Sequence, residues 1–169
     1  GANNIGIGYG SLSEILTVNN NTAVGHIALT NSVGANNTAV GASALTANTT
    51  GVSNVAVGYE SGDAVTTGSR NTFIGNASGS TCTTGSDNTF VGNLAGEATA
   101  GSNNTAVGQQ ALEVNSTGAS NVAIGKQALE ANTSANANTA VGVEAMRNNT
   151  TGGGNVAVGA YAADANTTG

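Results

Sequence analysis

The chain repeats one short pattern of polar and apolar residues along its whole length. The pattern is Asn-x-x-(Val/Ile)-Gly, and it occurs ten times. Its closing glycines are 17 residues apart in seven intervals and 16 apart in two. These glycines are Gly8, Gly25, Gly41, Gly58, Gly75, Gly92, Gly108, Gly125, Gly142 and Gly159. A fixed period of this size is typical of repeat architectures, in which each unit is stabilised by its neighbours.

Counting each unit from its Asn, positions two to four predict a short β-strand. Position four is always Val or Ile, and position two is Thr, Val or Ile. Side chains alternate along a strand, so these two positions share one face, which we expect to be the core face. Position three points the other way and is also apolar, with Ala in seven units, Gly6 in one, and Phe73 and Phe90 in two. We expect this second apolar face to be covered by another copy of the chain.

The length of the unit predicts one rung of an all-β, parallel β-solenoid (β-roll). Seventeen extended residues span at most about 56–61 Å, enough for two short strands and two bends. Two helices and a turn would need more residues, and the abundant Val, Ile, Thr, Asn and Gly favour strands and bends. We therefore expect residues 1–169 to form a single array of ten rungs, cut as a window from a longer fibre.

Glycine and asparagine recur where each rung must bend. Gly at position five, and again three residues before the Asn in eight units, fits bends that need a positive φ. The repeated Asn either forms a ladder of side-chain amides that caps main-chain groups, or is simply tolerated in the left-handed conformation. The residues assigned to this structural role are Asn21, Asn37, Asn54, Asn71, Asn88, Asn104, Asn121, Asn138, Gly25, Gly41, Gly58, Gly75, Gly92, Gly108, Gly125 and Gly142.

Positions eight and nine carry a packing signal. Position eight is only Ala or Ser, which predicts a crowded site. Position nine is Leu or Met in most units, but it is Gly62, Gly79 and Gly96 in the fourth to sixth. Phe73 and Phe90 occupy position three in the fifth and sixth. Because close packing conserves volume, we predict that these two structural phenylalanines fill the space of the missing leucines.

Composition excludes several classes of partner. Nine acidic residues against three basic ones give a net charge of −6, so we expect no nucleic-acid binding. No apolar run reaches the roughly 20 residues of a membrane span, and the first residues do not resemble a signal peptide. A single cysteine, Cys82, excludes an intrachain disulfide and a cysteine-based zinc site.

The sequence shows no catalytic constellation, so we expect no enzyme activity and no cofactor. The only histidine, His26, stands at position six. Tyr9, Tyr59, Gln109 and Lys126 occupy the same position in other units, and such variety is typical of a solvent-facing column. A triad would also need a base oriented by a third group in a cleft.

Acidic residues gather at position ten. They are Asp63, Glu97, Glu113, Glu130 and Asp164. We interpret this column as a solvated stripe, because unit charges about 4.8 Å apart in water repel by only about 0.9 kcal/mol. A divalent-cation site on Glu97, Glu113 and Glu130 is the alternative. Arg147 follows at the same position and is expected to pair with Glu130.

Pairs of Thr or Ser precede the bend in most units, as in Thr49-Thr50, Thr66-Thr67 and Thr150-Thr151. Ordered hydroxyl ladders can bind ice or sugar. Adjacent residues nevertheless point to different faces, unlike a flat Thr-x-Thr strand. A carbohydrate- or ice-binding module that uses these pairs or the position-six column is therefore the alternative function.

Several segments resemble repeats of phage tail-fibre proteins and related bacterial surface fibres, and are distantly similar to trimeric autotransporter adhesin heads. They are Asn21-Thr22-Ala23-Val24-Gly25, Ala47-Asn48-Thr49-Thr50-Gly51 and Asn121-Val122-Ala123-Ile124-Gly125-Lys126-Gln127-Ala128-Leu129. The resemblance covers all ten units. It implies a parallel homotrimer, with two further copies of the chain as partners, in a fibre that carries a receptor-binding tip.

The leading hypothesis is therefore a structural shaft or head segment of a phage tail fibre or bacterial surface fibre. Such a segment would be extracellular, on a virion or a bacterial cell surface, and would support host or surface attachment. A cell-surface glycan or protein receptor would be bound by a tip outside this window.

Overall fold

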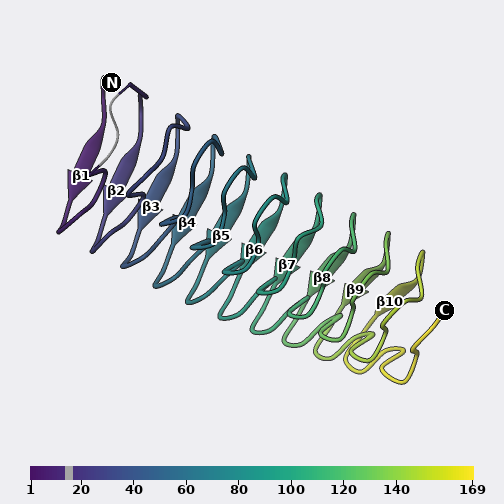
Figure 1. Ribbon diagram of the computed structural model, residues 1–169. Helices are drawn as coiled ribbons and strands as arrows, with labels where there is room; N and C mark the ends of the chain where they lie inside the picture. The colour runs from purple at the N-terminus through teal and green to yellow at the C-terminus, as the bar shows by residue number, and fades with distance from the viewer. Residues whose placement is uncertain (14–16) are drawn as a thin grey trace.

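The computed structural model describes residues 1–13 and 17–169, which form one parallel stack of rungs (Figure 1). Ten strands of three residues lie in these ranges: β1 (Ile5–Ile7), β2 (Thr22–Val24), β3 (Thr38–Val40), β4 (Val55–Val57), β5 (Thr72–Ile74), β6 (Thr89–Val91), β7 (Thr105–Val107), β8 (Val122–Ile124), β9 (Thr139–Val141) and β10 (Val156–Val158). They make one sheet in sequence order, and every pairing is parallel. The predicted all-β parallel β-solenoid is confirmed.

The register is the same at every step of the stack. Thr72 pairs with Thr89, Phe73 with Phe90, and Ile74 with Val91, so equal positions of successive rungs lie above one another. The 16-residue unit between β2 and β3 keeps this register, with Thr22 opposite Thr38. The missing residue is therefore absorbed outside the strand, and each position of the repeat becomes a straight column.

Each described rung contains one strand rather than the two that the length of the unit predicts. Beyond the strand, positions seven and nine lie in the left-handed region, as at Gln127 (φ 57) and Leu129 (φ 51). These corners prevent a second regular strand. The main chain there still donates to the neighbouring rung, as from Leu129 N to the Ala145 carbonyl at 3.0 Å.

The two faces of the strand are reversed relative to the prediction. Position three lies inside the chain, where Ala39 and Ala106 are fully buried. Positions two and four point outward, and Ile74 remains 40% exposed. A Cβ placed on Gly6 would lie 3.3 Å from Ser11 Oγ and 3.4 Å from Leu12 Cδ1, so position three faces positions eight and nine across the lumen.

The width of the lumen explains this reversal. Ala at position three and Ala or Ser at position eight leave room for one Leu, whereas two β-branched side chains would not fit beside it. Alternation separates the two faces but does not show which one is inside. We call the outward-pointing side chains of positions two and four the outer sheet face.

Phe73 and Phe90 lie in the lumen, fully buried, with ring centroids 5.5 Å apart. A Cβ on Gly79 would lie 2.6 Å from Phe73 Cε1, and one on Gly62 would lie 2.7 Å from Phe73 Cδ2. A Cβ on Gly96 would collide with the ring of Phe90. The predicted exchange of volume between positions three and nine agrees with the structure. The expected contact of position three with another copy is wrong, because the compartment lies within one chain.

The two recurrent glycines are required for different reasons. Position five has a positive φ throughout, as at Gly58 (φ 141), where a Cβ would also collide with the carbonyl oxygen of Gly75. Three residues before the Asn, φ is not positive at Gly68, contrary to the prediction. A Cβ there would collide with the carbonyl oxygen of Gly85, so close approach of neighbouring rungs selects glycine at this site.

Candidate functional site

The position-one asparagines form a buried ladder that caps main-chain groups. The main-chain nitrogen of Asn54 donates to Asn37 Oδ1 at 2.9 Å, and Asn54 Nδ2 donates to the carbonyl of Gly68 at 2.8 Å. The same pair of bonds recurs at Asn71 and Asn138. The amide ladder is thus the arrangement present, and the left-handed conformation belongs to the residue before each Asn.

A second column of buried amides lies at position twelve, and the sequence pattern did not lead us to predict it. Its members Asn48, Asn115, Asn132 and Asn149 are fully buried. Asn115 Nδ2 donates to the Gly118 carbonyl at 2.8 Å, and Asn132 Nδ2 donates to Asn115 Oδ1 at 2.9 Å. The recurring Asn-(Thr/Ser) before the bend is the signal that could have identified it. Cys82 occupies this column as a free thiol, and its burial raises its pKa to about 11.

The first residue of several Thr/Ser pairs also links neighbouring rungs, whereas second residues such as Thr50 and Thr67 are exposed. Thr49 Oγ1 donates to the Thr66 carbonyl at 2.9 Å, and Thr66 Oγ1 donates to the Thr83 carbonyl at 3.1 Å. Thr133 and Thr150 make the same bond to their next rungs. A hydroxyl has one proton to donate, so these side chains have no donor left for a ligand.

The position-six column is exposed, as predicted, and varies from rung to rung. Tyr9 stacks on His26 with ring centroids 5.6 Å apart and an interplanar angle of 13°. Further along, Asn93 Nδ2 donates to Asn76 Oδ1 at 2.9 Å. The column therefore presents a different chemistry at almost every rung.

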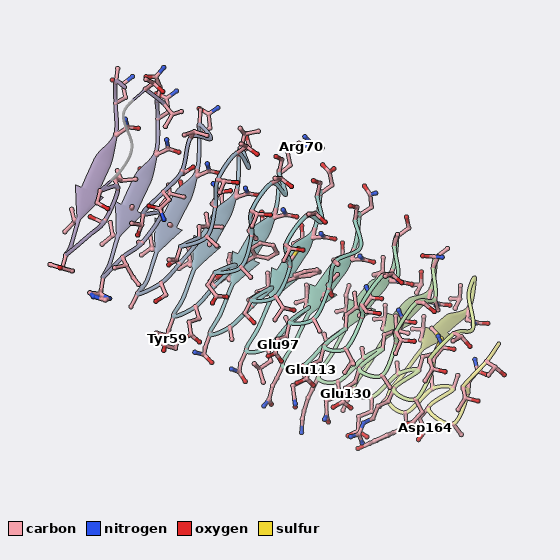
Figure 2. All side chains as sticks on the ribbon, viewed as in Figure 1. Tyr59, Arg70, Glu97, Glu113, Glu130 and Asp164 are labelled. Atoms are coloured by element: carbon pink, nitrogen blue, oxygen red, sulfur yellow. The ribbon has the colours of Figure 1, made fainter. Side chains whose placement is uncertain are left out.

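Acidic side chains line one edge of the stack, which we call the acidic edge (Figure 2). It comprises Glu60 and Glu144 at position seven with Asp63, Glu97, Glu113, Glu130 and Asp164 at position ten. In Figure 2 the labelled residues Glu97, Glu113, Glu130 and Asp164 follow one edge, and Arg70 lies on the opposite one. The charge of the chain is thus concentrated on one side.

Two glutamates of the acidic edge have hydrogen-bond or ion-pair partners on neighbouring side chains. Gln110 Nε2 donates to Glu113 Oε2, and Gln127 Nε2 donates to Glu130 Oε1, each at 3.0 Å. Arg147 Nε lies 2.5 Å from Glu130 Oε2, which confirms the predicted ion pair. Desolvation raises the pKa of Glu113, and repulsion from neighbouring glutamates adds to the shift.

Within the described ranges, no three His, Cys, Asp or Glu side chains lie close enough to hold a metal ion. Glu97, Glu113 and Glu130 therefore do not gather into the cation site considered above. The described residues enclose no pocket, and they include no helix that could cross a membrane.

Comparison of the chain with protein-family models, with curated proteins and with solved structures finds no match. The chain is thus characterised by its architecture, a parallel β-solenoid repeat with Asn and Thr ladders.

Proposed function

We propose that this chain is a structural segment of an extracellular fibre, the shaft or head of a phage tail fibre or bacterial surface fibre, assembled as a parallel homotrimer. The observation that carries the proposal is the constant register of the ten described rungs, which makes a rod along one axis (Figure 1). A rod of this kind displays a binding tip at a fixed distance from the particle or cell that carries it.

The stiffness of the rod comes from hydrogen bonds that run along its axis. In one rung Thr72 N donates to the Asn88 carbonyl, Gly75 N to Val57, and Ala77 N to Tyr59, at 2.8–2.9 Å. The two amide columns and the Thr hydroxyls add side-chain bonds in the same direction. Bending or stretching the rod must lengthen several of these bonds at every rung at once.

The exposed columns favour a spacer over the alternative of a carbohydrate- or ice-binding module. A ligand bound along a repeat would be met by the same side chain at each rung. Position six instead changes from Tyr59 to Asn76 to Lys126, and the first hydroxyl of pairs such as Thr49-Thr50 and Thr66-Thr67 donates to a main-chain carbonyl. The repeated amide side chains are directed inward and along the axis.

Removing two whole rungs tests the rod. Deleting residues 104–137, which joins Asn103 to Asn138 in phase with the repeat, should shorten the particle by about 9.6 Å at about 4.8 Å per rung. Small-angle X-ray scattering should show that decrease with an unchanged cross-section. Loss of folding, or a compact particle in place of a rod, would contradict the proposal.

Two further measurements test the role and the location. The intact chain should bind no sugar on a glycan array, because the proposed receptor-binding tip is a different part of the fibre. Antibodies to the folded chain should label filaments on virions or bacterial surfaces. Specific glycan binding by these rungs would favour the alternative module, and labelling confined to the cell interior would refute the fibre.

A further inference from the structure

We infer that three exposed asparagines, Asn20, Asn36 and Asn103, are acceptor sites for N-linked sugar. Each is the first residue of an Asn-Asn-Thr triplet, and so of the Asn-x-(Thr/Ser) motif that N-glycosyltransferases recognise. Each comes directly before an Asn of the buried ladder and has a positive φ, of 60, 64 and 62. The inference adds a modification site to the chain and does not depend on the proposed fibre function.

The motif occurs ten times in the chain, and burial closes several of its copies. In these copies the Asn belongs to the column at position twelve and is fully buried: Asn48, Asn115, Asn132 and Asn149. Asn48 Nδ2 donates to Ser32 Oγ at 3.0 Å and to the Gly51 carbonyl at 3.1 Å, which uses both amide protons. A sugar replaces one of these protons and needs space beside the nitrogen, so the folded chain cannot accept it there. Asn166 continues this column in the last rung and is half-buried.

In two further copies the hydroxyl of the motif is engaged. Asn76 is exposed, but Ser78 is fully buried and its Oγ donates to a main-chain carbonyl at 3.1 Å. Asn148 is exposed, but Thr150 Oγ1 donates to a main-chain carbonyl at 2.9 Å. A transferase that recognises the third residue through its hydroxyl finds no free donor at either copy.

At the three proposed sites both parts of the motif are accessible. Asn103 is exposed and Thr105 is half-buried, and within the described ranges neither side chain donates to another group of the chain. Asn20 donates one amide proton to Asn36 Oδ1 at 3.1 Å and keeps the other. A sugar on Asn20 would replace the second proton and leave this bond between rungs in place.

The three sites lie along the edge opposite the acidic edge. They occupy the same position of the repeat as Arg70, directly before a ladder Asn, and Figure 2 shows Arg70 at that edge. Asn20 and Asn36 belong to adjacent rungs about 4.8 Å apart, so a sugar on one crowds the other. Asn103 has no proposed acceptor in either adjacent rung, and we therefore expect it to be modified most completely.

Attachment forms one bond between Asn Nδ2 and a sugar. The nitrogen attacks the anomeric carbon of a nucleotide-activated hexose and loses one proton to a base of the transferase. The bond between that carbon and the phosphate oxygen breaks, and the nucleoside diphosphate leaves with the electron pair. The step needs no oxidant or reductant.

Incubation of the folded chain with a soluble, sequon-specific N-glycosyltransferase and UDP-glucose tests the inference. Peptide mapping by mass spectrometry should find hexose on Asn103, Asn20 and Asn36, and none on Asn48 or Asn76. A synthetic peptide of residues 100–108, modified in the same assay, shows that the transferase is active. A folded chain that stays unmodified beside a modified peptide would overturn the inference, and so would equal modification of Asn48.

Substitutions at the third residue of the motif provide matched controls. Thr105→Val should abolish hexose at Asn103, whereas Thr105→Ser should retain it, because only Ser keeps the hydroxyl. Val122 occupies the same position in the next rung, so the repeat accepts Val there, and circular dichroism checks the fold.

A gain of site completes the test. Ser120→Asn with Val122→Thr should create a new acceptor one rung beyond Asn103, and this double variant decides alone if Thr105→Val does not fold. Hexose that persists at Asn103 in folded Thr105→Val, or a double variant without hexose at position 120, would overturn the assignment of these sites.

Discussion

Replacing Phe90 by Ala should open a cavity in the lumen of the sixth rung. The ring is fully buried and lies against Gly96, where no side chain is available to move into the space. Removal of a buried phenylalanine costs about 3–5 kcal/mol when the surroundings cannot collapse. We expect Phe90→Ala to lose stability within this range.

Adding Gly96→Leu to the same variant should restore much of the loss. The double variant gives the sixth rung the Ala and Leu that the seventh rung has at Ala106 and Leu112. The backbone already suits this change, since φ is 58 at Gly96 and 54 at Leu112. The remaining cost is the left-handed conformation of a non-glycine residue, about 1–2 kcal/mol. Gly96→Leu alone should destabilise the chain, because its Cβ would collide with Phe90.

The assay is urea denaturation of the four members of this cycle, followed by circular dichroism. The two substitutions should show a favourable coupling of at least about 2 kcal/mol. Phe73→Ala with Gly79→Leu is the matched comparison and should recover less, because Phe73 also covers Gly62. A double variant at Phe90 and Gly96 that is no more stable than Phe90→Ala would refute the shared compartment.

Four other substitutions test the ladder, the corner, the acidic edge and the ion pair between Arg70 and Asp87. Asn71→Ala should lower the free energy of unfolding by about 2–4 kcal/mol, since it leaves a buried main-chain N–H and a carbonyl without partners; an effect below 1 kcal/mol in urea denaturation would contradict the capping role. Gly58→Ala should be far more destabilising than Gly154→Ala in thermal unfolding, because only the first adds a collision with main chain; equal effects would contradict this. The raised pKa of Glu113 means that its protonated form favours folding, a contribution present below its unfolded pKa of about 4.3 and lost as pH rises through the higher folded value. Glu113→Gln should therefore raise Tm at pH 7 and leave it unchanged at pH 3. Asp87→Asn should lower Tm at pH 7, because Arg70 lowers the pKa of Asp87 and the ionised form therefore favours folding. The difference in Tm between this variant and the unmodified chain should vanish as pH falls through that lowered pKa.

The repeat made the architecture predictable. The spacing of the glycines located every strand, and the alternation at positions two to four identified two apolar faces. The exchange between Phe73 or Phe90 and the glycines of position nine identified one packed compartment, because close packing must conserve volume at each rung.

The reversed faces and the left-handed corners could not be predicted from the pattern. Whether Ala or Val points inward depends on the width of the lumen, which is set by corners at positions seven and nine. Those corners hold residues such as Gln127 and Leu129 at positive φ, where the residue type gives no sign of the conformation. The cross-rung bonds of their main chain hold these corners in place. The second amide column was missed because Asn48 and its equivalents lie beside Thr and Ser, in a segment that reads as a polar turn.

The most direct test of the account is the mass of the folded chain in solution. Sedimentation equilibrium over a wide range of concentrations should give three times the chain mass of 16.1 kDa, as the proposed homotrimer requires. A stable, folded particle that keeps the mass of one chain, 16.1 kDa, or of two chains at every concentration would contradict the homotrimeric fibre.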